Sequence, residues 1–240
     1  MSSFLTGPVV VAAQTLHSSS ADKYHMLGEI IFANDGRAFR YCKAGTTALV
    51  AGKLQQSSAE DTGLQNLTAV AAAVDDLSVA STTTVTVTAN EYAEGFALVT
   101  VTPGVGRQYK VKGHIAYTSA APTFNLFEGV VVALTTTSRL DLVRNPYSAV
   151  VVNPITLTSA PIGVAVHPIT ASQFGWLQVL GVANILADGA NAVGANVVAS
   201  NGVAGAVEDA AAPGLQPLVG TCLTGAADTE YGAVRLAGIL

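Results

Sequence analysis

Charge is scarce in this sequence of 240 residues. Asp, Glu, Lys and Arg make up 11% of the chain, against about 25% in a typical soluble domain. The 11 Lys and Arg residues are scattered, and the formal net charge is −5. A protein that binds nucleic acid needs clustered basic side chains to neutralise phosphates. We therefore expect no nucleic-acid partner and a surface made largely of Thr, Ser, Ala, Gly and Asn.

Cysteine and histidine are also few, and they are not arranged as metal ligands. Neither Cys42 nor Cys222 lies near a histidine in the sequence, and no two of the four histidines have ligand spacing. Asp22 and His25 form the nearest approach to a ligand pair, and a closed site needs three or four ligands. We expect no metal and no cofactor. The two cysteines are interpreted as buried free thiols.

Sequence motifs of catalysis are missing as well. The sequence contains no Gly-x-Ser-x-Gly, and residues 45–54 fail the spacing of a phosphate-binding loop. His114 lies on the polar face of an alternating stretch and is interpreted as solvated. Neighbouring carboxylates are interpreted as solvated loop residues; they occur at Glu60-Asp61, Asp75-Asp76 and Glu208-Asp209. We expect no catalytic residues, although distant Ser, His and Asp side chains can converge in a fold.

No apolar run reaches the roughly 18 residues that a membrane-spanning helix needs, so we expect no membrane partner. The first apolar run also differs from a secretory signal. No Lys or Arg precedes Lys23, and Pro8 comes directly before the run of valines. The chain is therefore expected to keep its N-terminal segment.

Strand and turn signals are abundant. Asn34-Asp35-Gly36 joins two apolar runs and predicts a β-hairpin. Residues 81–90 and 108–117 alternate apolar and polar side chains, which is typical of half-buried strands. Residues 64–77 instead place Leu and Val at helical spacing and predict a short helix. We predict an all-β protein of small β-barrel or β-sandwich units, with an extended N-terminal arm and at most one short helix.

Three segments are expected along the chain. Residues 1–26 form an arm, residues 27–160 a β-rich domain containing the hairpin, and residues 161–240 a small barrel-like unit with frequent turns. Residues 48–57 and 190–200 share an Ala-rich approach to a glycine followed by a short strand. This similarity hints at two related β units.

Two sets of residues are candidates for interaction with a partner. The arm lacks a nearby segment with which to fold, so we expect it to order only on assembly. Its apolar candidates are Phe4, Leu5, Val9, Val10 and Val11. Trp176, the only tryptophan, lies in the most apolar strand. It is interpreted as a core residue, and the alternative is an anchor at a subunit interface.

Several stretches resemble the head decoration, or cement, proteins of tailed phages. These stretches are residues 27–56, 90–99, 137–152 and 161–189. The resemblance implies an all-β protein, commonly a trimer, that binds the outside of an icosahedral shell. It implies synthesis in the host cytoplasm, a final place on the outer capsid surface, and the major capsid protein as partner. No catalytic residues come with this resemblance.

Composition adds an argument for assembly, because 50% of the residues are hydrophobic and surfaces left apolar are commonly covered by partners. We expect a homo-oligomer, specifically a homotrimer, with a non-enzymatic virion role. The alternatives are a phage tail-fibre or surface adhesin module, and a virion-associated hydrolase whose catalytic residues are dispersed in the sequence.

Overall fold

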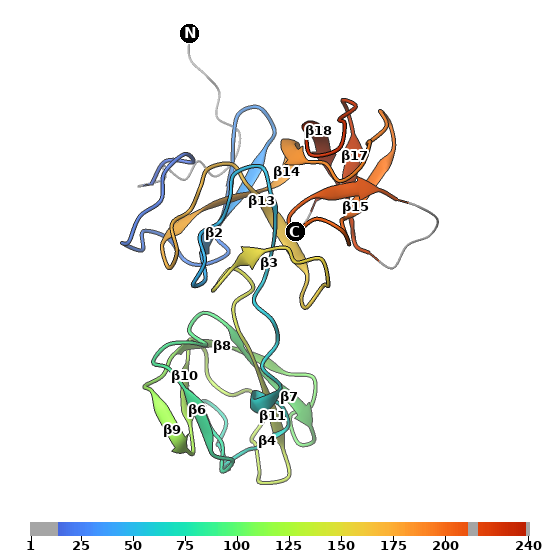
Figure 1. Cartoon of the computed structure of the whole chain (residues 1–240). Coiled ribbons are helices and arrows are strands. Elements are labelled where there is room, and N and C mark those ends of the chain that lie inside the picture. Colours follow the sequence, from blue (N-terminus) through green and yellow to red (C-terminus); the bar gives the residue numbers. More distant parts are fainter. Residues whose placement is uncertain (1–13, 211–215, 239–240) are drawn as a thin grey trace. The chain divides into compact units, whose positions relative to one another are not determined.

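The computed structural model describes residues 14–210 and 216–238 (Figure 1). It is built almost entirely of β-strands, which confirms the predicted all-β class. Among the described residues the one helical element is a 3-10 turn, η1 (Thr62–Leu64). The chain forms two compact units. Unit 1 combines residues 1–59 with residues 146–240, and unit 2 comprises residues 60–145.

This division differs from the three consecutive segments expected from the sequence. Unit 2 is inserted between β3 (Leu54–Gln56) and β12 (Val151–Val152), and these two strands pair with each other in unit 1. The predicted domain of residues 27–160 therefore mixes both units. Turn signals and composition report only local structure, so they do not reveal that strands on either side of an insertion belong together.

The helix predicted over residues 64–77 is wrong. This stretch holds β4 (Leu67–Thr68) and continues as isolated bridges, Ala69 with Ser81 and Ala72 with Leu134. Val74 is exposed, although helical spacing placed it on the buried face. Backbone pairing with distant strands has overridden the local periodicity.

Unit 2 is a small closed barrel. Its six strands pair in the order β4, β11 (Arg139–Val143), β7 (Phe96–Val101), β8 (Gln108–Gly113), β10 (Thr123–Leu126) and β5 (Ser78–Ala80). Bonds from Val70 N to Ala80 O (2.8 Å) and from Thr82 N to Thr68 O (2.9 Å) join the last strand to the first. A separate ribbon pairs β6 (Val85–Val87) with β9 (Tyr117–Ala120). Closure pairs the edges that would otherwise attract other chains.

Unit 1 contains two further barrels. The strands of the first are β2 (Ala38–Lys43), β14 (Phe174–Leu186), β13 (Pro161–Ala165), β3 and β12, in pairing order. A parallel bridge from Ala44 to Val150 closes it. The predicted hairpin at Asp35-Gly36 is present, and it joins β1 (Ile30–Phe32) to β2.

The second barrel shares the long strand β14 with the first. Its strands are β14, β18 (Tyr231–Leu236), β17 (Leu218–Cys222), β15 (Asn196–Ala199) and β16 (Val207–Asp209), in pairing order. A parallel bridge from Ala187 to Val207 closes it. The first half of β14 pairs with β2 and β13, and the half from Gly181 onward pairs with β18. The side-chain amide of Gln178 donates to the carbonyls of Leu180 and Val182 across this transition.

The two barrels repeat one topology. Numbered by sequence, the strands of each barrel follow the ring order first, third, second, fourth, fifth, and the parallel bridge always joins the first and third. The similar stretches 48–57 and 190–200 both lead into the second strand of their barrel. Gly52 N bonds Ala165 O at 2.7 Å, and its counterpart Gly194 N bonds Cys222 O at 2.8 Å.

Close backbone contacts repeat as well. An added Cβ at Gly163 would lie 2.9 Å from the carbonyl oxygen of Gln178, and one at Gly220 would lie 2.2 Å from that of Arg235. Gly175 and Gly232 are separated by 57 residues, as are Gly163 and Gly220. Gly175 faces Ile169, and Gly232 faces the counterpart of Ile169, which is Ala226. Fourth and fifth strands therefore approach each other in the same way in both barrels. We conclude that unit 1 is an internal structural repeat.

Unit 1 has an apolar core cluster in each barrel, and the cluster of the second barrel also includes Leu54 and Val164 from the first. Both cysteines are free and buried, Cys42 in the core of the first barrel and Cys222 in that of the second, as the sequence suggested. A separate aromatic cluster lies on the first barrel and includes Phe39, Tyr41 and Trp176.

Candidate interaction surface

The N-terminal segment covers the aromatic cluster of the first barrel. Leu16 and Leu27 pack against the cluster. Residues 14–26 are therefore already placed on unit 1, and the prediction that the whole arm of residues 1–26 orders only on assembly is wrong for this part. Burial of aromatic surface offsets the entropy that the segment loses on ordering. The candidates Phe4, Leu5, Val9, Val10 and Val11 lie outside the described residues.

Backbone and side-chain bonds fix this segment on β14. Ser20 N donates to Phe174 O at 3.0 Å, and Phe174 N donates to Ser20 O at 2.8 Å. Gln14 is buried. Its side-chain nitrogen donates to Phe174 O, and its side-chain oxygen accepts from the Tyr41 hydroxyl. The backbone carbonyl of Gln14 accepts from Trp176 Nε1 at 3.2 Å. The segment thus adds to the edge of β14 by strand pairing and by a satisfied buried amide.

Trp176 is 1% exposed and lies inside the cluster. Its ring centroid is 5.0 Å from that of Tyr41 and 5.1 Å from that of His25. The placement agrees with the core interpretation. A side chain so enclosed by its own chain is not available as an interface anchor in this conformation.

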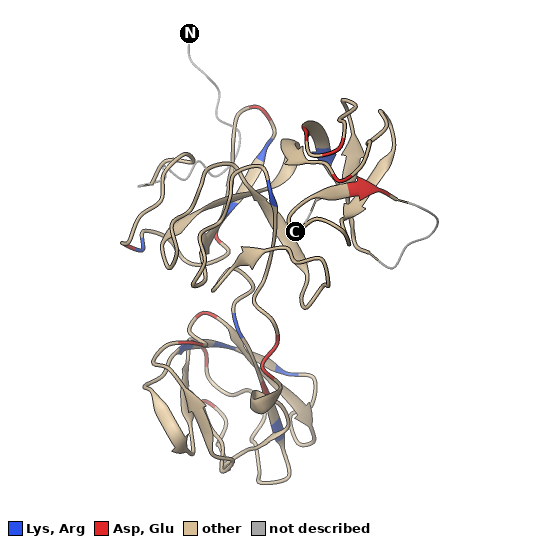
Figure 2. Ribbon diagram, viewed as in Figure 1, with Lys and Arg blue, Asp and Glu red and all other residues tan. Residues whose placement is uncertain are grey.

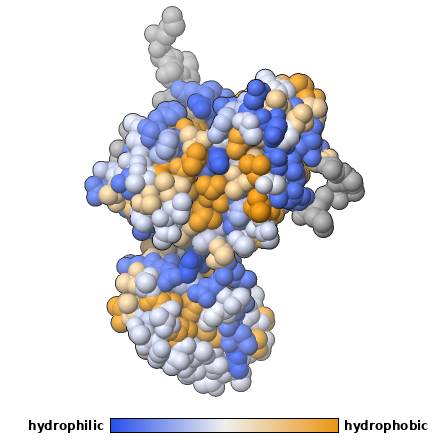
Figure 3. Space-filling view, in the orientation of Figure 1, coloured by the Kyte–Doolittle hydropathy of each residue, from blue (hydrophilic) through white to orange (hydrophobic). Residues whose placement is uncertain are grey.

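A groove of about 510 Å³ lies on unit 1 beside the second half of β14. Its lining includes Gly52, Val182, Asn184, Tyr231 and Ala233. Val182 is 50% exposed and Tyr231 46% exposed. The Tyr231 ring rests against the backbone of Gly52, where an added Cβ would come within 2.5 Å of Cε1. In Figure 3, apolar patches interrupt the polar surface of unit 1.

Among the described residues, the one charged residue that lines this groove, Arg37, is already paired. Arg37, at the rim, pairs its Nε with the Asp35 carboxylate at 2.7 Å, and its backbone N–H also donates to that carboxylate. These two hydrogen bonds hold the pKa of Asp35 below its ordinary value. Figure 2 shows the remaining charged residues scattered over both units. The groove therefore suits an uncharged ligand with apolar side chains.

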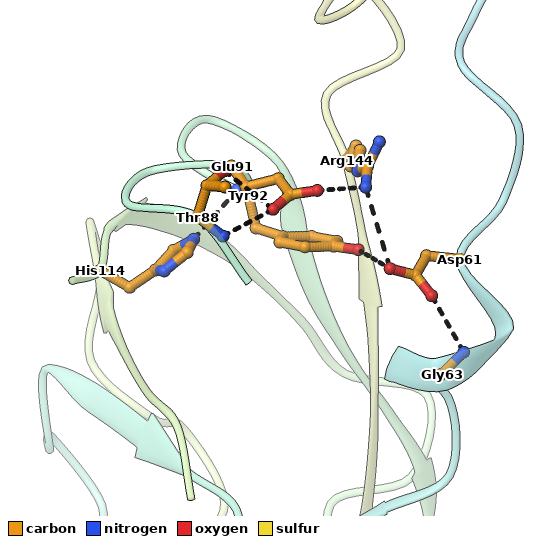
Figure 4. Close-up of polar contacts among 7 residues, drawn as sticks. All are labelled: Asp61, Gly63, Thr88, Glu91, Tyr92, His114 and Arg144. Carbon is orange, nitrogen blue, oxygen red and sulfur yellow. Dashed lines mark hydrogen bonds and ion pairs between the residues drawn. The ribbon is translucent and has the colours of Figure 1, made fainter. Parts of the chain in front are cut away.

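A cluster of ionisable side chains lies in unit 2 (Figure 4). The Arg144 guanidinium forms ion pairs with Glu91 and, at 3.8 Å, with Asp61. Asp61 also caps η1 through Gly63 N (3.0 Å) and accepts from the Tyr92 hydroxyl at 3.3 Å. Arg144 lies over the Tyr92 ring. Since Asp61 begins unit 2 and Arg144 nearly ends it, the cluster fastens the two ends of the inserted chain together.

The chemistry of this cluster is that of a structural network. Burial raises the pKa of the Tyr92 hydroxyl well above its ordinary range, so the hydroxyl keeps its proton at neutral pH. His114, expected to be solvated, is instead 5% exposed. Its Nε2 accepts from Tyr92 N at 3.0 Å, and its Nδ1 lies 2.8 Å from Ile115 O. Both ring nitrogens thus serve the backbone. The alternating pattern did not predict the burial of His114, because His114 follows β8, where the chain turns.

Within the described ranges, no group of three His, Cys, Asp or Glu side chains is placed to hold a metal ion. In the same part of the chain, no helix is long and apolar enough to cross a membrane.

Comparison with known proteins gave no match: no family model, curated protein or solved structure is significantly similar to this chain.

Proposed function

We propose that this chain is a non-enzymatic structural protein that decorates the outside of a phage capsid, acting as a homotrimer bound to the major capsid protein. The observation that carries the proposal is an all-β surface with few charges and exposed apolar side chains outside the groove, such as Ile115, Phe127 and Val193. Such a surface suits binding through apolar contacts and strand edges. The resemblance to phage decoration proteins in the sequence supports the same class.

The arrangement of ionisable groups supports a binding rather than a catalytic role. Asp61 and Glu91 are both paired with Arg144, and the nitrogens of His114 are occupied by backbone groups. A catalytic acid or base must instead reach a substrate atom.

The test is quantitative mass spectrometry of purified particles of the phage that encodes the chain. We expect the protein in a fixed stoichiometric ratio to the major capsid protein, in tailless heads as well as in whole virions. Recovery only with tails would overturn the capsid role and favour a tail-fibre module.

Salt dependence gives a second measurement. Binding of purified protein to undecorated capsids is expected to change less than about threefold between about 50 and 200 mM salt, whereas a binder of 6–10 phosphates loses about 10³–10⁵ over this range. A collapse of binding across this range would show that charge, not apolar contact, carries the attachment.

A further inference from the structure

The repeat in unit 1 shows that the groove is the counterpart of a site that is filled on the first barrel. Trp176 pairs across the ladder with Tyr41, and the equivalent pair in the second barrel is Ala233 with Asn184. Two large aromatic side chains are thus replaced by small ones. The space that the two aromatic side chains fill in the first barrel corresponds to the groove that Asn184 and Ala233 line in the second.

The backbone edge repeats too. Phe174 is the counterpart of Tyr231, the first residue of the fifth strand in its barrel. Leu186 stands opposite Tyr231 but donates its N–H to Gly52 O at 2.9 Å. Leu186 and Tyr231 therefore form a non-hydrogen-bonded pair of the antiparallel ladder. The backbone N–H and C=O of Tyr231 consequently point away from β14. None of the described residues takes the place beside Tyr231 that Ser20 holds beside Phe174.

We propose that this groove binds residues 1–13 of a second copy of the chain. The segment adds as a short strand along Tyr231 and places an apolar side chain beside Ala233. This contact between copies goes beyond attachment to a capsid and does not depend on it.

Three observations favour this occupant. The residues that directly follow it, Gln14 to Ser20, dock on the equivalent edge of the first barrel. Residues 2–13 carry no charge and include two aromatic or leucine side chains and three consecutive valines, which suits a groove whose neighbouring Arg37 is already paired. Strand addition to an exposed edge, with side chains entering pockets, is an established mode of recognition.

Reach favours a second copy over the same chain. Thirteen residues extend at most about 45 Å at 3.3–3.6 Å each. The path along β14 from Trp176, where Gln14 is held, to Leu186 is roughly 33 Å at about 3.3 Å per residue. The groove begins earlier on this path, at Val182 to Asn184, roughly 20–26 Å from Trp176. A segment following its own β14 would bring only residues 1–8 to the groove and leave Val9 to Val11 short of it, whereas a second copy can place these three valines there.

Cysteine cross-linking between differently labelled chains tests the proposal directly. Val10→Cys and Phe4→Cys variants are each mixed with an Ala233→Cys variant under mild oxidation. We expect a disulfide-linked pair of chains in at least one mixture. The matched control is Leu218→Cys, an exposed position on the same barrel outside the groove lining. If neither mixture cross-links more than the control, the proposal is overturned.

A groove-filling variant gives an independent readout. Ala233→Trp restores the aromatic side chain of the first barrel and should block the groove, while Leu218→Trp should not. A synthetic peptide of residues 2–13 is expected to bind protein lacking these residues, and at least about tenfold more weakly in the Ala233→Trp background. Light scattering should show that deletion of residues 2–13 lowers the oligomeric state. Equal peptide binding in both backgrounds, or an unchanged oligomer after deletion, would overturn the proposal, as would cross-linking confined to single chains of a doubly substituted variant.

Discussion

At the scale of single residues, Arg144 joins two carboxylates that lie far apart in the sequence of unit 2. Its side chain is only 25% exposed and forms ion pairs with both carboxylates. Removing the cation leaves Asp61 and Glu91 close together without compensation, and packing on the Tyr92 ring is lost as well.

We therefore expect Arg144→Ala to lower the free energy of unfolding by about 1–3 kcal/mol, between the values typical of exposed and buried pairs. Urea unfolding measures this. Arg107→Ala, at an exposed arginine of the same unit, is the control and should change stability by less than about 0.5 kcal/mol. Equal effects of the two variants would contradict the role of the cluster.

Cys42 makes stability depend on alkaline pH. Burial raises the pKa of its thiol far above the ordinary value. The folded state thus holds the proton more tightly than the unfolded state does. The stabilisation is complete below the unfolded pKa of about 8.5 and is lost as pH rises above it, by up to about 1.4 kcal/mol per pH unit. Cys42→Ala should flatten the decline between about pH 8 and 10, measured by urea unfolding. Parallel curves for the two proteins would show that another group is responsible.

At the scale of elements, the fourth and fifth strands of each barrel approach closely because glycine occupies the contact. In β17, a methyl group at Gly220 would overlap the carbonyl oxygen of Arg235 in β18. A backbone atom cannot rotate away as a side chain can, so the strands must separate.

We expect Gly220→Ala and Gly163→Ala each to cost about 1–3 kcal/mol, as other forms of overpacking do. Gly225→Ala is the matched control, since its added Cβ would meet no atom closer than 3.5 Å. Thermal unfolding should place the control near the unsubstituted protein and both other variants well below it. A tolerated Gly220→Ala would contradict the close approach.

At the scale of the whole molecule, unit 2 is a closed barrel with its own core, inserted in one repeat of unit 1. The second barrel joins the equivalent strands, β15 and β16, by residues 200–206 alone. The connection between second and third strands therefore needs no inserted unit.

We expect residues 60–145 to fold when produced alone, because their apolar core lies within this unit and the Asp61–Arg144 ion pair joins their ends. We also expect unit 1 to fold when residues 60–145 are replaced by a short Gly/Ser linker. Cooperative thermal unfolding and dispersed amide NMR spectra of each part would show this. An unfolded spectrum for residues 60–145 would mean that this unit depends on the rest of the chain.

The sequence by itself determined the β class, because alternation at residues 81–90 and the Asp35-Gly36 turn act locally. It also hinted, through the similarity of residues 48–57 and 190–200, at two related β units. Only the tertiary structure decided that Leu67 and its neighbours pair in a barrel instead of forming a helix, and that His114 is buried. The same holds for the insertion of unit 2 and for the groove at Ala233. Each of these features depends on which distant strands pair. The free energy that stabilises this pairing comes from closing barrels and burying cores rather than from the preferences of neighbouring residues.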